Sequence, residues 1–125
     1  MSLNQSLLFL GSALSVIWGV AHLFPTKGVV RGFGDISTDN RHIITMEWII
    51  EGVSLIFIGV IVALVTFIDP AHPISFAIYV ASILMYVILA LISFFTGFKV
   101  QFLPYKLCPF IFLTSAALIS IGAFI

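Results

Sequence analysis

Four long apolar segments constrain the fold of this 125-residue chain more than any other feature of its sequence. They cover residues 6–24, 43–67, 74–98 and 103–125. Each is close to the ~20 residues that a helix needs to cross a hydrocarbon core of ~30 Å. Backbone groups inside a bilayer must hydrogen-bond within their own helix or within a closed barrel, and uninterrupted runs of this length favour helices. The sequence therefore predicts an all-α polytopic membrane protein with four transmembrane helices.

The charge content supports the same class. Only 8% of the residues are charged and 62% are hydrophobic, and the mean hydropathy is +1.27. A soluble domain of ordinary composition has roughly a quarter of its residues charged. So few charged side chains cannot cover a water-exposed surface, and the lipid bilayer is the expected environment of the outer faces. The net charge is zero, and nothing in the sequence indicates a nucleic-acid partner.

The connections between the apolar segments are short and contain proline and glycine, as is typical where helices end. Short connections favour antiparallel packing of helices that follow each other in the chain. The sequence shows neither an internal repeat nor a linker. We therefore expect a single domain, residues 1–125, built as an antiparallel bundle of four helices. One cysteine is present, which excludes an intrachain disulfide.

The basic residues predict the orientation of the bundle. All five of them lie at the first and third connections: Lys27, Arg31, Arg41, Lys99 and Lys106. Basic residues near short loops favour the cytoplasmic side of a membrane. We therefore expect loops 25–42 and 99–103 to face the cytoplasm, and both termini to lie outside (N-out/C-out).

Two glutamates occupy an unusual place in the second apolar segment. Glu47 and Glu51 lie one helical turn apart, and Glu51 lies roughly 12 Å along the helix from Ile43 at ~1.5 Å per residue. An ionised carboxylate that faces lipid at such a depth costs several kcal/mol, so intramembrane acids generally face the bundle interior or water. His22 lies near the cytoplasmic end of the first segment, at a depth comparable to that of Glu47. The sequence therefore predicts that His22 pairs with a glutamate between the first two helices.

Small and polar residues follow one face of each predicted helix. In the third segment Ser82 and Tyr86 belong to such a stripe, and Ser93 continues it seven residues later. In lipid, these stripes turn towards neighbouring helices, where small side chains allow close approach and hydroxyl groups find partners. The stripes are thus explained by packing alone, although Tyr86 and Ser93 also approach the level of the glutamates.

These observations predict a ligand-binding site at the cytoplasmic end of the bundle. Its candidate residues are His22, Glu47, Glu51, Tyr86, Ser93 and Arg41. Alternative interpretations stay open for each: Glu47 could lie in a solvated first turn of its helix, and His22 could be an interfacial histidine. Three potential ligands from two helices are a weak metal signal, and we predict no metal site and name no cofactor. Trp18 and Trp48 are interpreted as interfacial or packing aromatics.

Two stretches, "WGVAHLFP" and "MEWIIEGVSLIFIG", resemble DoxX-like small four-helix membrane proteins. The matching residues are Gly19 and His22 for a G-x-x-H pattern, and Glu51, Gly52, Leu55 and Gly59 for most of an E-G pattern in the second helix. The resemblance covers the first half of the chain, which departs from it in the long first loop and in the additional Glu47. It implies a link to respiratory or redox complexes, including quinol-oxidising and thiosulfate-oxidising ones.

A second likeness is to membrane domains related to sterol isomerases. These also combine an aspartate–x–arginine with a following helical glutamate, as Asp39, Arg41 and Glu47 do here. The chain is short for the usual plan of those domains, and we rank this resemblance lower.

Three functions are compatible with these features. The first is a binding module whose polar site holds the head of an amphipathic small molecule such as a quinone, lipid or isoprenoid. The second is an accessory subunit, which would pack against a membrane partner or a second copy of itself without chemistry of its own. The third is an enzyme in which a glutamate and His22 exchange protons with a lipid-like substrate.

Overall fold

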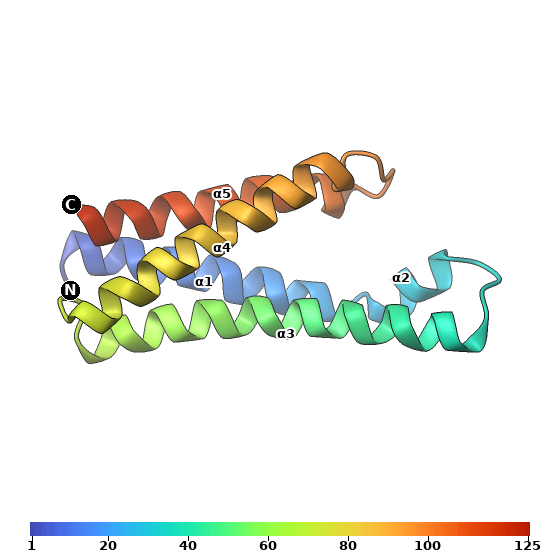
Figure 1. Ribbon diagram of the computed structural model, residues 1–125, viewed down its shortest axis with the longest axis horizontal. Coiled ribbons are helices and arrows are strands. Elements are labelled where there is room, and N and C mark those ends of the chain that lie inside the picture. Colours follow the sequence, from blue (N-terminus) through green and yellow to red (C-terminus); the bar gives the residue numbers. More distant parts are fainter.

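The computed structural model describes residues 1–125, and all of its regular structure is helical. The helices are α1 (Leu3–Leu23), α2 (Thr26–Gly32), α3 (Thr38–Ile68), α4 (Pro73–Gly97) and α5 (Leu103–Phe124) (Figure 1). Four of them, all except α2, are long and apolar enough to cross a membrane. The predicted all-α fold with four potential membrane spans is therefore confirmed.

Helix α1 lies at the centre of the packing, in extensive antiparallel contact with both α3 and α5. Helix α4 packs along α5 and has only a small interface with α3, from which it diverges after the turn that joins them (Figure 1). Helices α3 and α4 are antiparallel, as expected, but they contact each other chiefly near the turn that joins them, where the Thr66 and Tyr79 hydroxyl groups lie 2.9 Å apart. Gly97 allows the close packing of α4 on α5, because a Cβ atom at this position would lie 2.6 Å from the Tyr105 carbonyl oxygen of α5.

The contact between α1 and α3 depends on small residues. A Cβ atom at Gly19 would lie 2.7 Å from the Gly52 carbonyl oxygen, and one at Gly59 would lie 2.6 Å from the Ser12 carbonyl oxygen. Between these positions, the Ser15 hydroxyl donates a 2.9 Å hydrogen bond to a backbone carbonyl of α3. The small-residue stripe of the first segment therefore faces a neighbouring helix, as the sequence predicts.

The first connection differs from the expectation of a loop. Residues 26–32 form α2, and α3 begins at Thr38 instead of Ile43. The side chain of Ser37 caps α3 by accepting a 3.2 Å hydrogen bond from the Asn40 amide, which extends the helix through a polar turn. At ~1.5 Å per residue, the 31 residues of α3 span about 46 Å, more than a hydrocarbon core of ~30 Å. Helix α3 therefore projects beyond α1, α4 and α5 at one end (Figure 1).

We predict that Gly59→Ala destabilises the protein by about 1–3 kcal/mol, the usual cost of overpacking. The added methyl group would meet the backbone of α1, which cannot move away without separating the two helices. Thermal unfolding in detergent, followed by circular dichroism, measures the effect. Gly28→Ala is the matched control, because a Cβ at that position meets no atom within 4 Å. Equal unfolding temperatures for the two variants would contradict the packing described here.

Candidate functional site

The C-terminal end of α1 and the middle of α3 bring together a histidine and a glutamate. Nε2 of His22 lies 3.2 Å from Oε2 of Glu51. The His22 side chain is only 7% exposed, whereas that of Glu51 is 47% exposed. The separation fits an ion pair when the imidazole is protonated, but the buried Nε2 has no well-directed hydrogen bond in the protein. This nitrogen is therefore available to a further hydrogen-bonding group.

Trp48 fixes the position of His22. Pro25 directly follows the C-cap residue of α1, and the carbonyl groups at a helix C-terminus lack intrahelical partners. The indole N–H of Trp48 donates a 2.6 Å hydrogen bond to one of them, the carbonyl of His22. The two rings also stack, with centroids 3.9 Å apart and an interplanar angle of 16°. Trp48 thus holds both the backbone and the side chain of His22.

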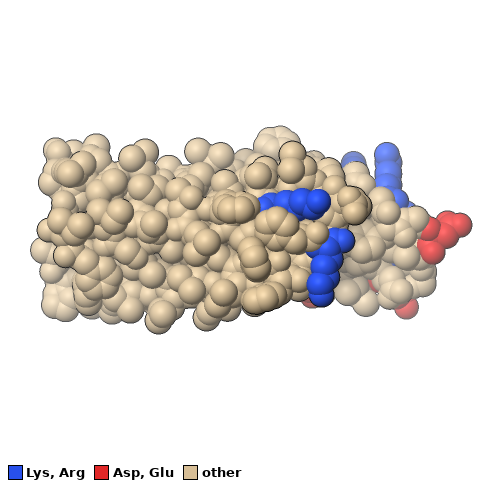
Figure 2. Space-filling view, turned by 90° about the horizontal axis from the view of Figure 1, so that it is seen from above, with Lys and Arg blue, Asp and Glu red and all other residues tan.

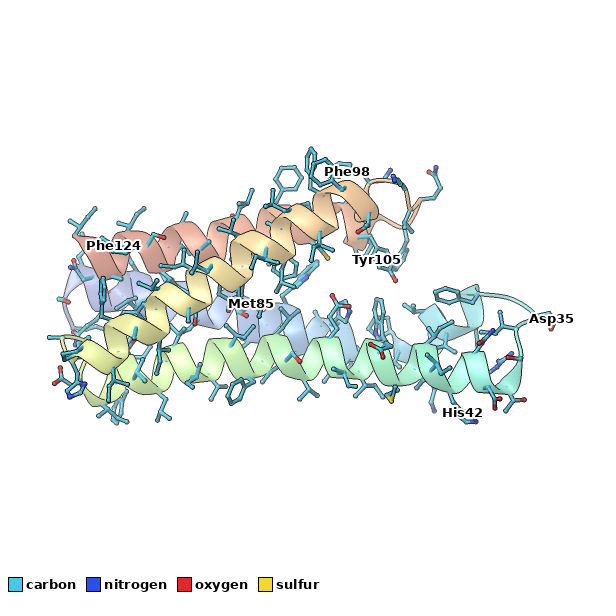
Figure 3. All side chains as sticks on the ribbon, in the orientation of Figure 1. Asp35, His42, Met85, Phe98, Tyr105 and Phe124 are labelled. Atoms are coloured by element: carbon cyan, nitrogen blue, oxygen red, sulfur yellow. The ribbon has the colours of Figure 1, made fainter.

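A small cavity lies beside this stack, between the C-terminal end of α1, the N-terminal half of α3 and the start of α5. Its volume is about 120 Å³, and most of its lining is apolar. The lining includes Trp18, His22, Trp48, Phe102, Tyr105 and Cys108. Tyr105 meets Trp48 edge-on at 5.7 Å and projects from the start of α5 towards α3 (Figure 3). Nε1 of Trp18 is also buried without a hydrogen-bond partner.

A second, more open hollow adjoins this cavity and carries the acidic groups. It measures about 350 Å³ and shares Trp48 and Tyr105 with the inner cavity. Its lining contains Glu47 and Glu51 together with isoleucines of α3. The two adjacent spaces are together called the His22 cleft below, with the inner cavity as its aromatic part and the open hollow as its acidic part.

The structure places the other predicted site residues elsewhere. Tyr86 is fully buried in the bundle and stacks on Phe112 at 6.4 Å. The Ser93 hydroxyl donates to the Ala90 carbonyl within α4, and Arg41 is exposed near the start of α3 without an ion pair. None of the three predicted residues, Tyr86, Ser93 and Arg41, lines the His22 cleft.

Several residues that line the cleft were not predicted as site residues. Trp18 lies four residues before His22, and Trp48 lies three residues before Glu51. These spacings place each tryptophan on the same helix face as the polar residue, and this signal was available in the sequence. Tyr105 and Cys108 come from α5, and no spacing relates them to α1 or α3.

No group of three or more His, Cys, Asp or Glu side chains lies close enough together to hold a metal ion. No protein-family model, curated protein or solved structure matches this chain.

We predict that Trp48→Phe destabilises the protein by about 1 kcal/mol more than Trp18→Phe does, the net value of a typical hydrogen bond. The first substitution removes the bond to the His22 carbonyl, whereas the Trp18 indole N–H has no partner to lose. Because both change a tryptophan that lines the same cavity, the second is a close control. Chemical unfolding in detergent compares them, and equal losses would show that the hydrogen bond contributes little.

Proposed function

We propose that the protein binds an amphipathic small molecule, such as a quinone, a lipid or an isoprenoid, in the His22 cleft. The observation that carries the proposal is the buried Nε2 of His22, which has no directed hydrogen bond and lies where an aromatic cavity meets an acidic mouth. Buried polar atoms without partners are rare in folded proteins and call for an explanation. A bound polar group would make the well-directed hydrogen bond that Glu51, 3.2 Å away, does not make.

The two parts of the cleft suit the two parts of such a ligand. The inner cavity of about 120 Å³ is smaller than the ~300 Å³ of a typical small-molecule site, so it would take a ring or a short segment only. The remainder would extend into the adjoining 350 Å³ hollow or between the helices towards lipid. The aromatic walls formed by Trp18, Trp48 and Tyr105 favour a planar or unsaturated group.

The polar groups would orient the ligand. His22 can donate or accept a hydrogen bond through Nε2, depending on its protonation, and Glu51 accepts when ionised. Glu47 lies at the mouth and would contact only a ligand that reaches out of the cleft. The same His22 and Glu51 would carry proton exchange if a reaction occurred, so the enzyme hypothesis uses this site as well.

We predict that decylubiquinone quenches the intrinsic tryptophan fluorescence of the protein in nanodiscs in a saturable way. Both tryptophans of the chain line the cavity, so the signal reports directly on its occupancy. His22→Ala and Glu51→Gln should each raise Kd about tenfold, corresponding to ~1.4 kcal/mol. Mass spectrometry of organic extracts from the purified protein identifies any amphipathic molecule that co-purifies in stoichiometric amount.

His42→Ala and Asp35→Asn are the matched controls, because both residues are exposed near the projecting end of the molecule and away from the cleft (Figure 3). Neither control should change Kd. Absence of both saturable quenching and a co-purified amphipathic molecule would refute the binding function. The role of a non-catalytic accessory subunit would then be the better explanation.

We further propose that the end of the bundle with the His22 cleft faces the cytoplasm and that both termini lie outside. The termini lie together at one end of the molecule, and the connections that carry the basic residues lie at the other (Figure 1). Figure 2 shows lysine and arginine side chains only on this second half of the visible face. The positive-inside rule supports this orientation.

We predict that Ala71→Cys, in the turn between α3 and α4, reacts with a membrane-impermeant maleimide on intact cells. Asp35→Cys, in the connection between α2 and α3, should react only after permeabilisation. Both positions are exposed, and the native Cys108 is buried, so the unsubstituted chain measures the background. The opposite labelling pattern would reverse the proposed orientation.

A further inference from the structure

Two side chains that line the inner cavity of the His22 cleft carry a buried nitrogen atom without a hydrogen-bond partner. The atoms are Nε1 of Trp18 and Nε2 of His22. The chain contains four buried side-chain polar atoms of this kind, so two of the four belong to one small cavity. The groups that this cavity can bind depend on whether these nitrogens donate or accept a hydrogen bond.

The nitrogen of Trp18 is a donor only, because an indole N–H has no lone pair available to accept a hydrogen bond. No group of the folded chain accepts its proton. Cys108 lines the same cavity, but a thiol is a weak acceptor, and this one donates to the Pro104 carbonyl at 3.4 Å. The polar group that satisfies Trp18 is therefore an acceptor that a ligand brings into the cavity.

The contact with Glu51 makes Nε2 of His22 a donor as well. The two groups lie 3.2 Å apart, and an ionised carboxylate only accepts hydrogen bonds. Two acceptors at this distance would repel each other, so the contact assigns a proton to Nε2. Because the contact is not well directed, this N–H can also reach an oxygen atom in the cavity. The inner cavity thus offers two N–H donors.

Acceptors are scarce in the same space. No carboxylate, side-chain amide, serine or threonine lines the inner cavity. Glu51 is a strong acceptor, but it lines the outer hollow and already faces His22. A ring hydroxyl that entered the inner cavity would bring a donor of its own, and a buried donor without a partner costs about 1–3 kcal/mol. A ring carbonyl accepts a hydrogen bond and brings no such donor.

We propose that the His22 cleft selects the oxidised, carbonyl-bearing form of a ring ligand over its reduced, hydroxyl-bearing form, and that Trp18 determines this selectivity. The inference rests on the proposed binding function and narrows its ligand to a quinone or a related ring ketone. A site that binds the oxidised form more tightly makes the bound ring harder to reduce. A tenfold preference lowers the midpoint potential of a two-electron couple by about 30 mV.

Decylubiquinone and decylubiquinol, which differ only in the two hydrogen atoms of the reduced ring, test the proposal in nanodiscs. The quinone is bound first, and anaerobic addition of the quinol then displaces it, with tryptophan fluorescence as the signal. The quinol should bind about tenfold more weakly, corresponding to ~1.4 kcal/mol. A redox titration of the bound ring should give a midpoint potential about 30 mV below that measured in nanodiscs without the protein.

The benzothiophene analogue of tryptophan at position 18, in which sulfur replaces the N–H, removes the donor and keeps the shape of the ring. It should raise the Kd of the quinone about tenfold, so that the two forms bind equally. Trp18→Phe should have the same effect, and Trp48 remains as the fluorophore in both variants. His42→Ala, which changes an exposed residue away from the cavity, should keep the preference.

The outcomes separate this inference from the proposed function. Equal or tighter binding of the quinol by the native chain would overturn the selectivity and leave the binding function standing. A preference for the quinone that survives the loss of the Trp18 N–H would overturn the role of Trp18. Absence of saturable binding by either form would refute the proposed function together with the inference that rests on it.

Discussion

The close approach of α1 and α3 is the interaction on which the rest of the structure depends. Lipid tails are as apolar as the helices, so the hydrophobic effect does not drive their association within a membrane, and packing and interhelical hydrogen bonds take its place. Gly19 and Gly59 let the two backbones meet, and Ser15 joins them by a hydrogen bond. At this separation His22 reaches both Trp48 and Glu51.

The sequence predicts the parts of this arrangement that follow from periodicity and depth. Hydropathy locates the four spans, and the depth of His22, comparable to that of Glu47, predicts a pair with one of the two glutamates. The structure shows that the partner is Glu51, at 3.2 Å, and not Glu47. The helical turns at residues 26–32 and 38–42 escape prediction because they are polar or short and carry no membrane signal. The start of α3 at Thr38 follows from local capping by Ser37 and not from a hydrophobic pattern, whereas α2 begins after Pro25 without a side-chain cap.

The contribution of α5 to the cleft cannot be predicted from hydrophobic periodicity and depth in the membrane. Depth along a helix can be estimated from sequence, but the direction in which a helix leaves its neighbour cannot. Because α4 diverges from α3 to follow α5, Tyr86 lies in the bundle core and Tyr105 faces Trp48 instead. The choice between these two tyrosines depends on tertiary packing, including the close approach of Gly97 to the start of α5.

The same divergence explains why a polar cleft persists at this end of a mostly apolar molecule. A closed bundle would bury His22 and Glu51 without water, and an unsatisfied buried polar group costs about 1–3 kcal/mol. Here the cost is limited, because Glu51 stays half exposed at the mouth while only the imidazole is enclosed. Trp48 offsets part of the remaining desolvation cost, because its indole N–H donates a hydrogen bond to the His22 carbonyl. Trp48 thus holds a largely buried imidazole whose Nε2 lacks a well-directed hydrogen bond, and under the proposed function this prior desolvation would lower the cost of binding a polar group there.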